Sequence, residues 1–299
     1  MTQQNTLQAQ GVCKHYGKLT VLQDLDLTIE PGCIYGLIGR NGAGKTTLLS
    51  ILTGQNTMDA GTVCYNGEPV WENQNALRNL CFSRELNVTM TNGNTSSLRV
   101  KDYLRAGSLF FPYWDSAYAD RLVEKFGLDR KKKIFRMSKG QSSMVTIILA
   151  LASRAPITIL DEPVAGLDVV AREQFYRLLV EDYTETNRTF IISTHIIEEA
   201  AGVFERVIVL DEGRVVADSP VDAFVNGFRY LSGPEEIIDA ALSDYGLAPL
   251  QTQLLGRHKM VAVRGDPQML EQLSGRPGLE VSTMNLQNAF VALGGHGEE

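Results

Sequence analysis

The chain has 299 residues, of which 44% are hydrophobic and 21% charged, and a net charge of −7 at pH 7. One hydrophobic core rarely organises a chain of this length, so we expect one large domain and a smaller one. The acidic balance argues against broad, sequence-independent binding of nucleic acid. No apolar run approaches the roughly 18 residues of a membrane span, and the polar start resembles no secretory signal. These features predict an ordinary globular protein without a nucleic-acid partner.

The four cysteines show no metal-binding or disulfide-framework spacing. They are Cys13, Cys33, Cys64 and Cys81, and no two form a C-x-x-C pair. We expect free thiols in a reducing compartment.

Most of the chain alternates between short apolar runs and helical patterns. In chain order, the predicted strands are 12–21, 25–29, 34–38, 61–67, 157–160, 189–193 and 207–210, and the predicted helices are 47–52, 100–109, 116–126, 141–152, 170–184 and 196–204. A polar stretch at 88–98 is predicted to be an exposed loop. Buried strands that alternate with helices are typical of a largely parallel sheet with helices on both faces.

The pattern changes after Phe228. Helices are predicted at 234–245, 267–273 and 286–293, and strands at 259–263 and 279–281. This composition predicts a small α+β appendage, with a ferredoxin-like arrangement as one option. We therefore expect domains at 1–228 and 229–299, and a regulatory, dimerising or stabilising role for the second is open.

The segment from Gly39 to Thr46 matches the phosphate-loop pattern G-x-x-x-x-G-K-[ST] between a predicted strand and a predicted helix. Its backbone N–H groups and the helix N-terminus favour a polyphosphate. Lys45 is expected at the β- and γ-phosphates, and the Thr46 hydroxyl at Mg²⁺. The residues expected to bind nucleotide here are Gly39, Asn41, Gly42, Ala43, Gly44, Lys45, Thr46 and Thr47.

Two adjacent carboxylates end the apolar strand at 157–160. Strand C-termini in such a sheet face the ligand crevice. Asp161 is therefore expected to hold Mg²⁺, and Glu162 to polarise a hydrolytic water as the catalytic base.

Four further segments complete a family pattern. They are Tyr16 in Val12–Gly17, Met137–Gln141 (MSKGQ), Pro163–Asp168 (PVAGLD) and Ser193–His195 (STH). In this order, from Leu7 to about Val225, the motifs resemble those of the ATP-binding cassette (ABC) ATPases.

The resemblance implies an α/β fold of the P-loop NTPase type, with a mostly parallel sheet, an antiparallel β-subdomain and a helical subdomain at about 86–155. It implies ATP and Mg²⁺ as cofactors and a second ATP-binding subunit arranged head to tail with this one, as a homodimer or a heterodimer. Tyr16 then stacks on adenine, and His195 contacts the γ-phosphate as the second catalytic residue. Ser138, Gly140 and Gln141 serve ATP on the opposite subunit, and Asp168 links the two half-sites.

The chain departs from the family pattern at three positions. Lys139 replaces the usual middle glycine of the signature segment, Met137–Gln141. Glu85 stands where the family's Q-loop usually has glutamine, and a carboxylate there remains a candidate Mg²⁺ ligand. Ala165 stands where serine is common. Because Lys45 and the catalytic residues are present, we expect a competent half-site.

The resemblance also implies a separate membrane permease that inserts a short helix into a groove beside the helical subdomain. The aromatic run Phe110–Trp114 is a candidate wall of that groove, and filling of the subdomain core is an equally open alternative.

The segments 112–128 and 137–141 are similar to exporter-type ATPases of antimicrobial-peptide resistance or peptide-toxin export. The expected function is ATP hydrolysis at the cytoplasmic membrane face, as the ATP-binding subunit of an exporter of peptides, antimicrobials or other amphipathic molecules. Two alternatives are a soluble ABC ATPase, for example of iron–sulfur cluster assembly, and a nucleotide sensor with little turnover.

Overall fold

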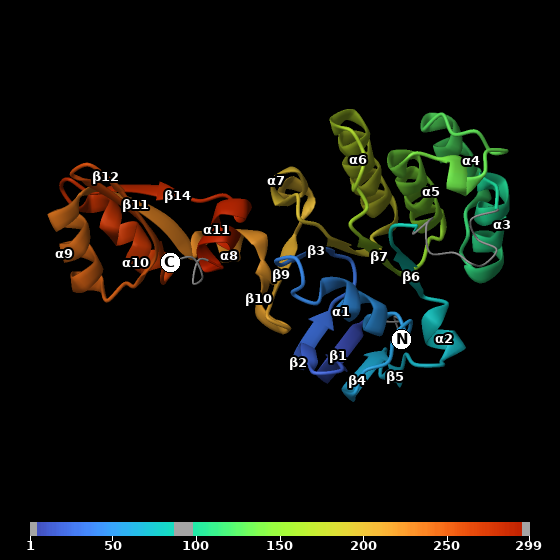
Figure 1. Ribbon diagram of the computed structural model, residues 1–299, viewed down its shortest axis with the longest axis horizontal. Coiled ribbons are helices and arrows are strands. Elements are labelled where there is room, and N and C mark those ends of the chain that lie inside the picture. The colour runs from blue at the N-terminus through green and yellow to red at the C-terminus, as the bar shows by residue number, and fades with distance from the viewer. Residues whose placement is uncertain (1–4, 87–97, 295–299) are drawn as a thin grey trace. The chain divides into compact units, whose positions relative to one another are not determined.

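The computed structural model describes residues 5–86 and 98–294 (Figure 1). The predicted loop at 88–98 lies almost entirely outside the described residues. The chain forms two compact units, one of Met1–His195 with Leu210–Val216 and one of Ile196–Val209 with Ala217–Glu299. The chain passes between the units after His195, within strand β9 (Arg206–Asp211) and within strand β10 (Arg214–Pro220).

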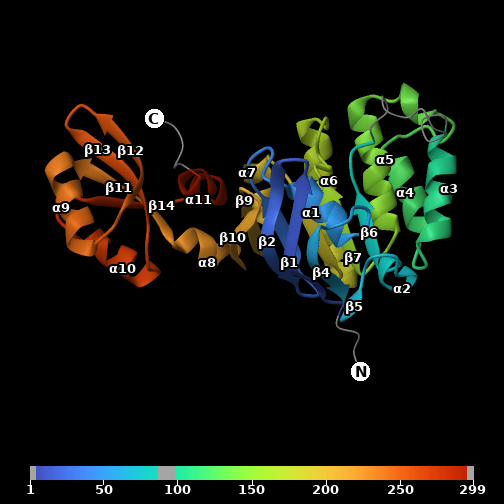
Figure 2. The ribbon, with the colours of Figure 1, turned by 60° about the horizontal axis from the view of Figure 1, so that its bottom comes forward.

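An antiparallel sheet opens the first unit. Strands β1 (Leu7–Tyr16), β2 (Leu19–Ile29), β4 (Ala60–Tyr65) and β5 (Glu68–Pro69) have the order β2-β1-β4-β5. Figure 2 shows β2, β1 and β4 side by side.

The prediction of one strand over 12–21 is wrong. Gly17 has a φ of +62°, a left-handed conformation that glycine adopts without steric cost, and the chain reverses there. The segment predicted as one strand therefore contains the end of β1, the turn and the start of β2, which pair as a hairpin.

A parallel sheet forms the centre of the first unit. Strands β3 (Ile34–Ile38), β8 (Thr189–Ser193), β7 (Ile157–Asp161) and β6 (Leu80–Ser83) lie in that order. Every residue of β3, β7 and β8 is buried, as expected for parallel strands covered on both faces. Helices α1 (Lys45–Leu52), α2 (Gln74–Leu77) and α6 (Val169–Thr186) belong to the same unit.

The helical subdomain consists of α3 (Val100–Phe110), α4 (Ser116–Lys125), a 3₁₀ turn (Ile134–Arg136) and α5 (Lys139–Ala152). Helix α5 packs against both α3 and α4, and the three helices lie together in Figures 1 and 2. Asp115 caps α4 by accepting a hydrogen bond from the Tyr118 N–H at 2.8 Å. The helices predicted here from periodicity are confirmed.

The second unit contains a ferredoxin-like βαββαβ fold. Its elements are β11 (Phe228–Pro234), α9 (Glu235–Tyr245), β12 (Pro249–Leu255), β13 (His258–Arg264), α10 (Pro267–Gln272) and β14 (Glu280–Thr283). The sheet order is β12-β13-β11-β14, and every neighbouring pair is antiparallel. The predicted α+β character is confirmed, and the sequence analysis missed β11 and β12.

Short helices accompany this sheet in the second unit. They are α7 (Ile197–Ala200), α8 (Val221–Asn226) and α11 (Leu286–Leu293), with 3₁₀ turns at Ala201–Val203 and Leu273–Gly275. The core between the sheet and α9 and α10 includes Leu231, Ile238, Val261 and Leu270. In residues 5–86 and 98–294, no helix combines the length and apolar character needed to cross a bilayer.

Candidate nucleotide site

The phosphate loop, Gly39–Thr46, joins the buried strand β3 to helix α1. Gly42 and Gly44 have φ angles of +84° and +103°, which residues other than glycine rarely adopt. A Cβ atom on Gly39 would lie 2.3 Å from the Leu210 carbonyl oxygen, so only glycine fits there. The glycine spacing of the motif therefore follows from the backbone path as well as from any ligand.

Lys45 lies at the start of α1 with only 8% of its surface exposed. Its ammonium donates to the carbonyl oxygens of Gly39 at 2.7 Å and Arg40 at 3.2 Å. Burial lowers the pKa of Lys45, and the nearby carboxylates of Glu162 and Asp161 partly offset that shift. The ammonium is thus held against the loop that is expected to surround the phosphates.

Asp161 ends β7 directly beside the phosphate loop. The Thr46 hydroxyl donates to one carboxylate oxygen at 2.7 Å, and the Ser193 hydroxyl donates to the other. The sequence analysis placed Ser193 in a family segment but did not predict its contact with Asp161. Its position opposite Asp161 in the parallel pairing of β7 and β8 could have identified it once that register was known.

Glu162 and His195 form a pair at the end of the same strands. The Glu162 Oε2 atom lies 2.7 Å from the His195 Nδ1 atom. Glu162 has a left-handed φ of +51°, and its N–H donates to the Ser193 carbonyl oxygen at 3.1 Å. This backbone hydrogen bond holds the strained residue, as is common at functional sites. The side chain of Glu162 is 25% exposed, so it remains open to water.

Tyr16, at the end of β1, presents an exposed ring. Half of the residue's surface is accessible to solvent. The phenol oxygen accepts a hydrogen bond from the Asn56 amide at 2.6 Å, and the Lys14 ammonium lies 5.3 Å from the ring centroid. These contacts orient the ring while leaving apolar surface accessible for stacking.

The signature segment, Met137–Gln141, caps helix α5. The exposed Ser138 accepts from the Gln141 N–H at 3.2 Å, and the Gln141 side-chain oxygen accepts from the Ser138 N–H at 3.3 Å. This is a capping box. Gln141 also accepts from the Lys132 ammonium at 2.8 Å, so its side chain orients the segment.

The interface loop, Pro163–Asp168, lies against the signature segment. A Cβ atom on Gly140 would lie 2.7 Å from the Gly166 carbonyl oxygen, and the Ser143 hydroxyl donates to the Ala165 carbonyl oxygen at 2.8 Å. Asp168 caps α6 by accepting from the Ala171 N–H at 2.8 Å. Asp168 therefore has a structural role in its own chain, whatever it contacts in another.

The predicted site residues thus fall into two groups. The phosphate loop, Asp161, Glu162 and His195 form one, and the signature segment and interface loop form the other. Glu85, predicted as a metal ligand, is paired with the signature segment: its Oε1 atom lies 3.2 Å from the Lys139 ammonium.

Comparisons with known proteins identify the family. The family model described as ABC transporter matches residues 22–165. The chain is 30% identical to the ABC transporter ATP-binding protein YtrB of Bacillus subtilis (strain 168), over 64% of each chain. It is 32% identical to the Nod factor export ATP-binding protein I of Burkholderia orbicola (strain AU 1054), over 95% of each chain.

The chain belongs to the ABC transporter family. Among solved structures, an ATP-binding subunit of an ABC transporter matches with a TM-score of 0.62 and 25% identity, over 73% of this chain and 91% of that one. The P-loop NTPase fold of the prediction is confirmed. The chain is an ATP-binding and ATP-hydrolysing subunit of a transporter.

The donors around Thr46 and Asp161 fit a hard divalent cation. Hydroxyl and carboxylate oxygens are the ligands that Mg²⁺ prefers, with phosphate oxygens and water completing the shell. Within the described residues, no group of three or more His, Cys, Asp or Glu side chains forms an all-protein metal cage.

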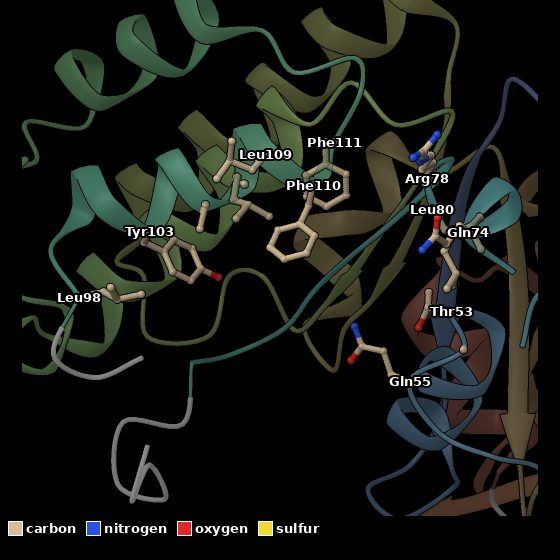
Figure 3. A pocket seen from close by; sticks show the side chains of 15 residues that line it. Thr53, Gln55, Gln74, Arg78, Leu80, Leu98, Tyr103, Leu109, Phe110 and Phe111 are labelled. Atoms are coloured by element: carbon tan, nitrogen blue, oxygen red, sulfur yellow. The ribbon is translucent and has the colours of Figure 1, made fainter. Parts of the chain in front are cut away.

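A groove of about 750 Å³ lies in the first unit between the helical subdomain and the sheet. In Figure 3, Phe110 and Phe111 lie across it from Gln55, Gln74 and Arg78. Phe110 is 76% exposed and the adjacent Leu109 is 80% exposed. Leu109 and Phe110 therefore place two exposed apolar side chains at this groove.

The structure divides the aromatic run at 110–114 between its two expected roles. Phe110 and Phe111 line the groove, whereas Trp114 packs beside Gly107, where an added Cβ would lie 3.0 Å from the Trp114 ring. Tyr113 is about half exposed, and its hydroxyl lies 3.4 Å from the Asn79 side-chain oxygen. Trp114 is therefore half-buried against α3, and the end of α3 supplies the groove's aromatic wall.

Proposed function

We propose that this chain is the ATP-hydrolysing subunit of an exporter, located at the cytoplasmic membrane face and docked on a separate membrane permease. The observation that carries the proposal is the combination of a complete hydrolytic pair, Glu162 and His195, with an exposed apolar groove. A nucleotide sensor needs no such groove.

The hydrolytic chemistry follows from the groups that are brought together. Lys45 and the phosphate-loop N–H groups would bind the ATP phosphates. Thr46 and Asp161 would hold Mg²⁺, whose charge would offset that of the phosphates. Glu162 accepts a proton from the attacking water, and its contact with His195 orients the carboxylate. His195, 57% exposed at its side chain, is accessible to the terminal phosphate.

Two subunits complete each site in this proposal. Ser138 is exposed at the start of α5, and the hydroxyl accepts a hydrogen bond within the capping box, so its own proton can be donated outward. The ATP bound by a partner would accept hydrogen bonds from this hydroxyl and from the Gly140 N–H, at the N-terminus of the helix. Asp168 would link the half-sites, and Tyr16 would stack on adenine in its own chain.

We further propose that residues 1–228 act as the nucleotide-binding domain and 229–299 as an accessory domain. Export is the favoured direction because the similarity to the Nod factor export protein extends over 95% of both chains. A peptide, antimicrobial or other amphipathic molecule is the proposed class of substrate.

The groove gives the direct test. Replacement of both Leu109 and Phe110 by serine should strongly reduce co-purification of an integral membrane protein with this subunit. ATP binding should be unchanged, because these side chains are exposed and lie outside the phosphate loop. The matched control is Leu254→Ser, which removes an apolar side chain that is 60% exposed in the second unit.

Two outcomes oppose the proposal. Co-purification of soluble scaffold proteins alone would favour an ATPase of cluster assembly, and undiminished capture of the permease by the double variant would exclude the groove as its docking site. Inverted vesicles that contain the captured permease then report the direction of transport.

A further inference from the structure

The two charged departures from the family's motifs contact each other. The Lys139 ammonium lies 3.2 Å from the Glu85 Oε1 atom, and the side chains are 54% and 47% exposed. Glu85 follows β6, and Lys139 is the first residue of α5, directly after Ser138. An acidic residue in the Q-loop and a basic residue in the signature segment therefore form one ion pair.

The stem of Lys139 makes a second contact. A Cβ atom on Gly166 would lie 2.6 Å from the Lys139 Cγ atom, so the methylene groups of Lys139 cover this glycine of the interface loop. Long basic side chains commonly bury their stems and leave the charge at the surface. One side chain thus connects the signature segment, the interface loop and Glu85.

The ion pair lies along a contact between β6 and α5. A buried hydrogen bond from the Ser83 hydroxyl to the Thr146 carbonyl oxygen, at 3.1 Å, joins these elements. The same two elements line the groove through Leu80 and Leu149. The buried hydrogen bond holds β6 and α5 together at one position. The exposed ion pair beside Ser138 is the weaker of the two interactions.

We propose that Glu85 and Lys139 are a positioning pair that sets the placement of Ser138 and the interface loop for ATP turnover. This effect needs only the ATPase activity and not the proposed export function.

Four variants test the pair. Lys139→Met keeps the stem over Gly166 and removes the charge, and Glu85→Gln removes the opposite charge. Each should lower kcat about two- to fivefold, the range of an exposed ion pair, with the KM for ATP unchanged. The double variant should be no slower than either single one, and the charge swap Glu85→Lys with Lys139→Glu should recover most of the rate.

The salt dependence provides a second readout. Raising the ionic strength should slow the unmodified chain toward the rate of the variants, which should themselves respond little. The matched control is Asp120→Asn, which removes an equally exposed ion pair with Arg130 in the same subdomain and should leave kcat unchanged.

Additive losses in the double variant together with no rescue by the swap would overturn the proposal. It would also fail if Glu85→Gln raised the Mg²⁺ concentration for half-maximal activity while Lys139→Met did not, because Glu85 would then act as a metal ligand. Failure to find a permease would refute the exporter function while leaving these kinetics intact, so the two failures are distinguishable.

Discussion

Lys45 combines a charge with an environment that disfavours charge. Burial lowers its pKa below the ordinary 10.5, although Glu162 and Asp161 lie close enough to offset part of the shift. The ammonium attracts phosphate and the neutral amine does not. Affinity for ATP is therefore complete below the folded-state pKa of Lys45 and is lost as the pH rises through it.

We accordingly expect ATP affinity to weaken between neutral pH and pH 10.5. An exposed lysine would lose its charge, and so weaken ATP binding, at a higher pH. Equilibrium dialysis with ATP across that pH interval measures the affinity. Lys45→Met should bind ATP weakly with a much flatter pH dependence. A constant affinity of the unmodified chain up to pH 10.5 would contradict the expectation.

At the residue scale, the sequence predicts which side chains lie around the phosphate loop where a motif fixes the backbone. The glycine pattern places Lys45 and Thr46 there, and the end of a strand places Asp161 beside them. Ser193 could not be found this way, because its role depends on the register between β7 and β8. The Glu85–Lys139 contact joins positions that the sequence shows only as separate departures.

At the scale of elements, a buried charge network ties the helical subdomain to the sheet. Asp182 of α6 is 1% exposed and accepts from Arg188 at 2.7 Å and from Arg154 at 2.9 Å. Arg188 also donates to the Leu151 carbonyl oxygen of α5 at 3.0 Å, and Arg154 to the Asp115 carboxylate that caps α4 at 3.2 Å. Arg154 and Arg188 thus link α4 and α5 to the buried carboxylate of α6.

Replacement of Asp182 by asparagine should reduce the free energy of unfolding by about 3–5 kcal/mol, because two arginines lose their buried counter-charge. Urea denaturation measures the change. Glu185→Gln is the matched control: Glu185 contacts the same Arg154 at 3.4 Å but is 68% exposed, so we expect a loss of at most about 1 kcal/mol. Equal losses in the two variants would show that burial is not the deciding factor.

The elements themselves were predictable where the period is clear and the boundary has a local cause. Helices α4 and α6 carry N-caps at Asp115 and Asp168 that mark their starts. The hairpin at Gly17 was missed because Gly17 stands between Tyr16 and Lys18, without the Asn-Gly or Asp-Gly pair that usually marks a tight hairpin turn. Strands β11 and β12 were missed because their sequences mix polar and apolar residues without a clear period. Both form by pairing with β13, which the sequence alone does not show.

At the scale of the whole molecule, the proposed function gives this chain two unlike halves of a nucleotide site. In that proposal, the group around Lys45 and Glu162 would bind and hydrolyse ATP, and the exposed Ser138 would donate to a phosphate on the partner. Two copies arranged head to tail would satisfy both groups in each site. The terminal phosphate would then bridge two surfaces, and its hydrolysis would remove the bridge.

Glu162→Gln should therefore trap a dimer in the presence of ATP and Mg²⁺. Glutamine keeps the shape of the side chain but cannot accept the proton of the attacking water, so turnover should fall at least a hundredfold. Size-exclusion chromatography with light scattering should show monomers without nucleotide and dimers with ATP but not with ADP.

Adding Ser138→Arg to this variant should abolish the dimer, because the bulky side chain blocks the surface that meets the partner's phosphate. ATP binding at Lys45 should persist in that double variant. A dimer that forms equally well without ATP, or despite the arginine, would refute the shared site.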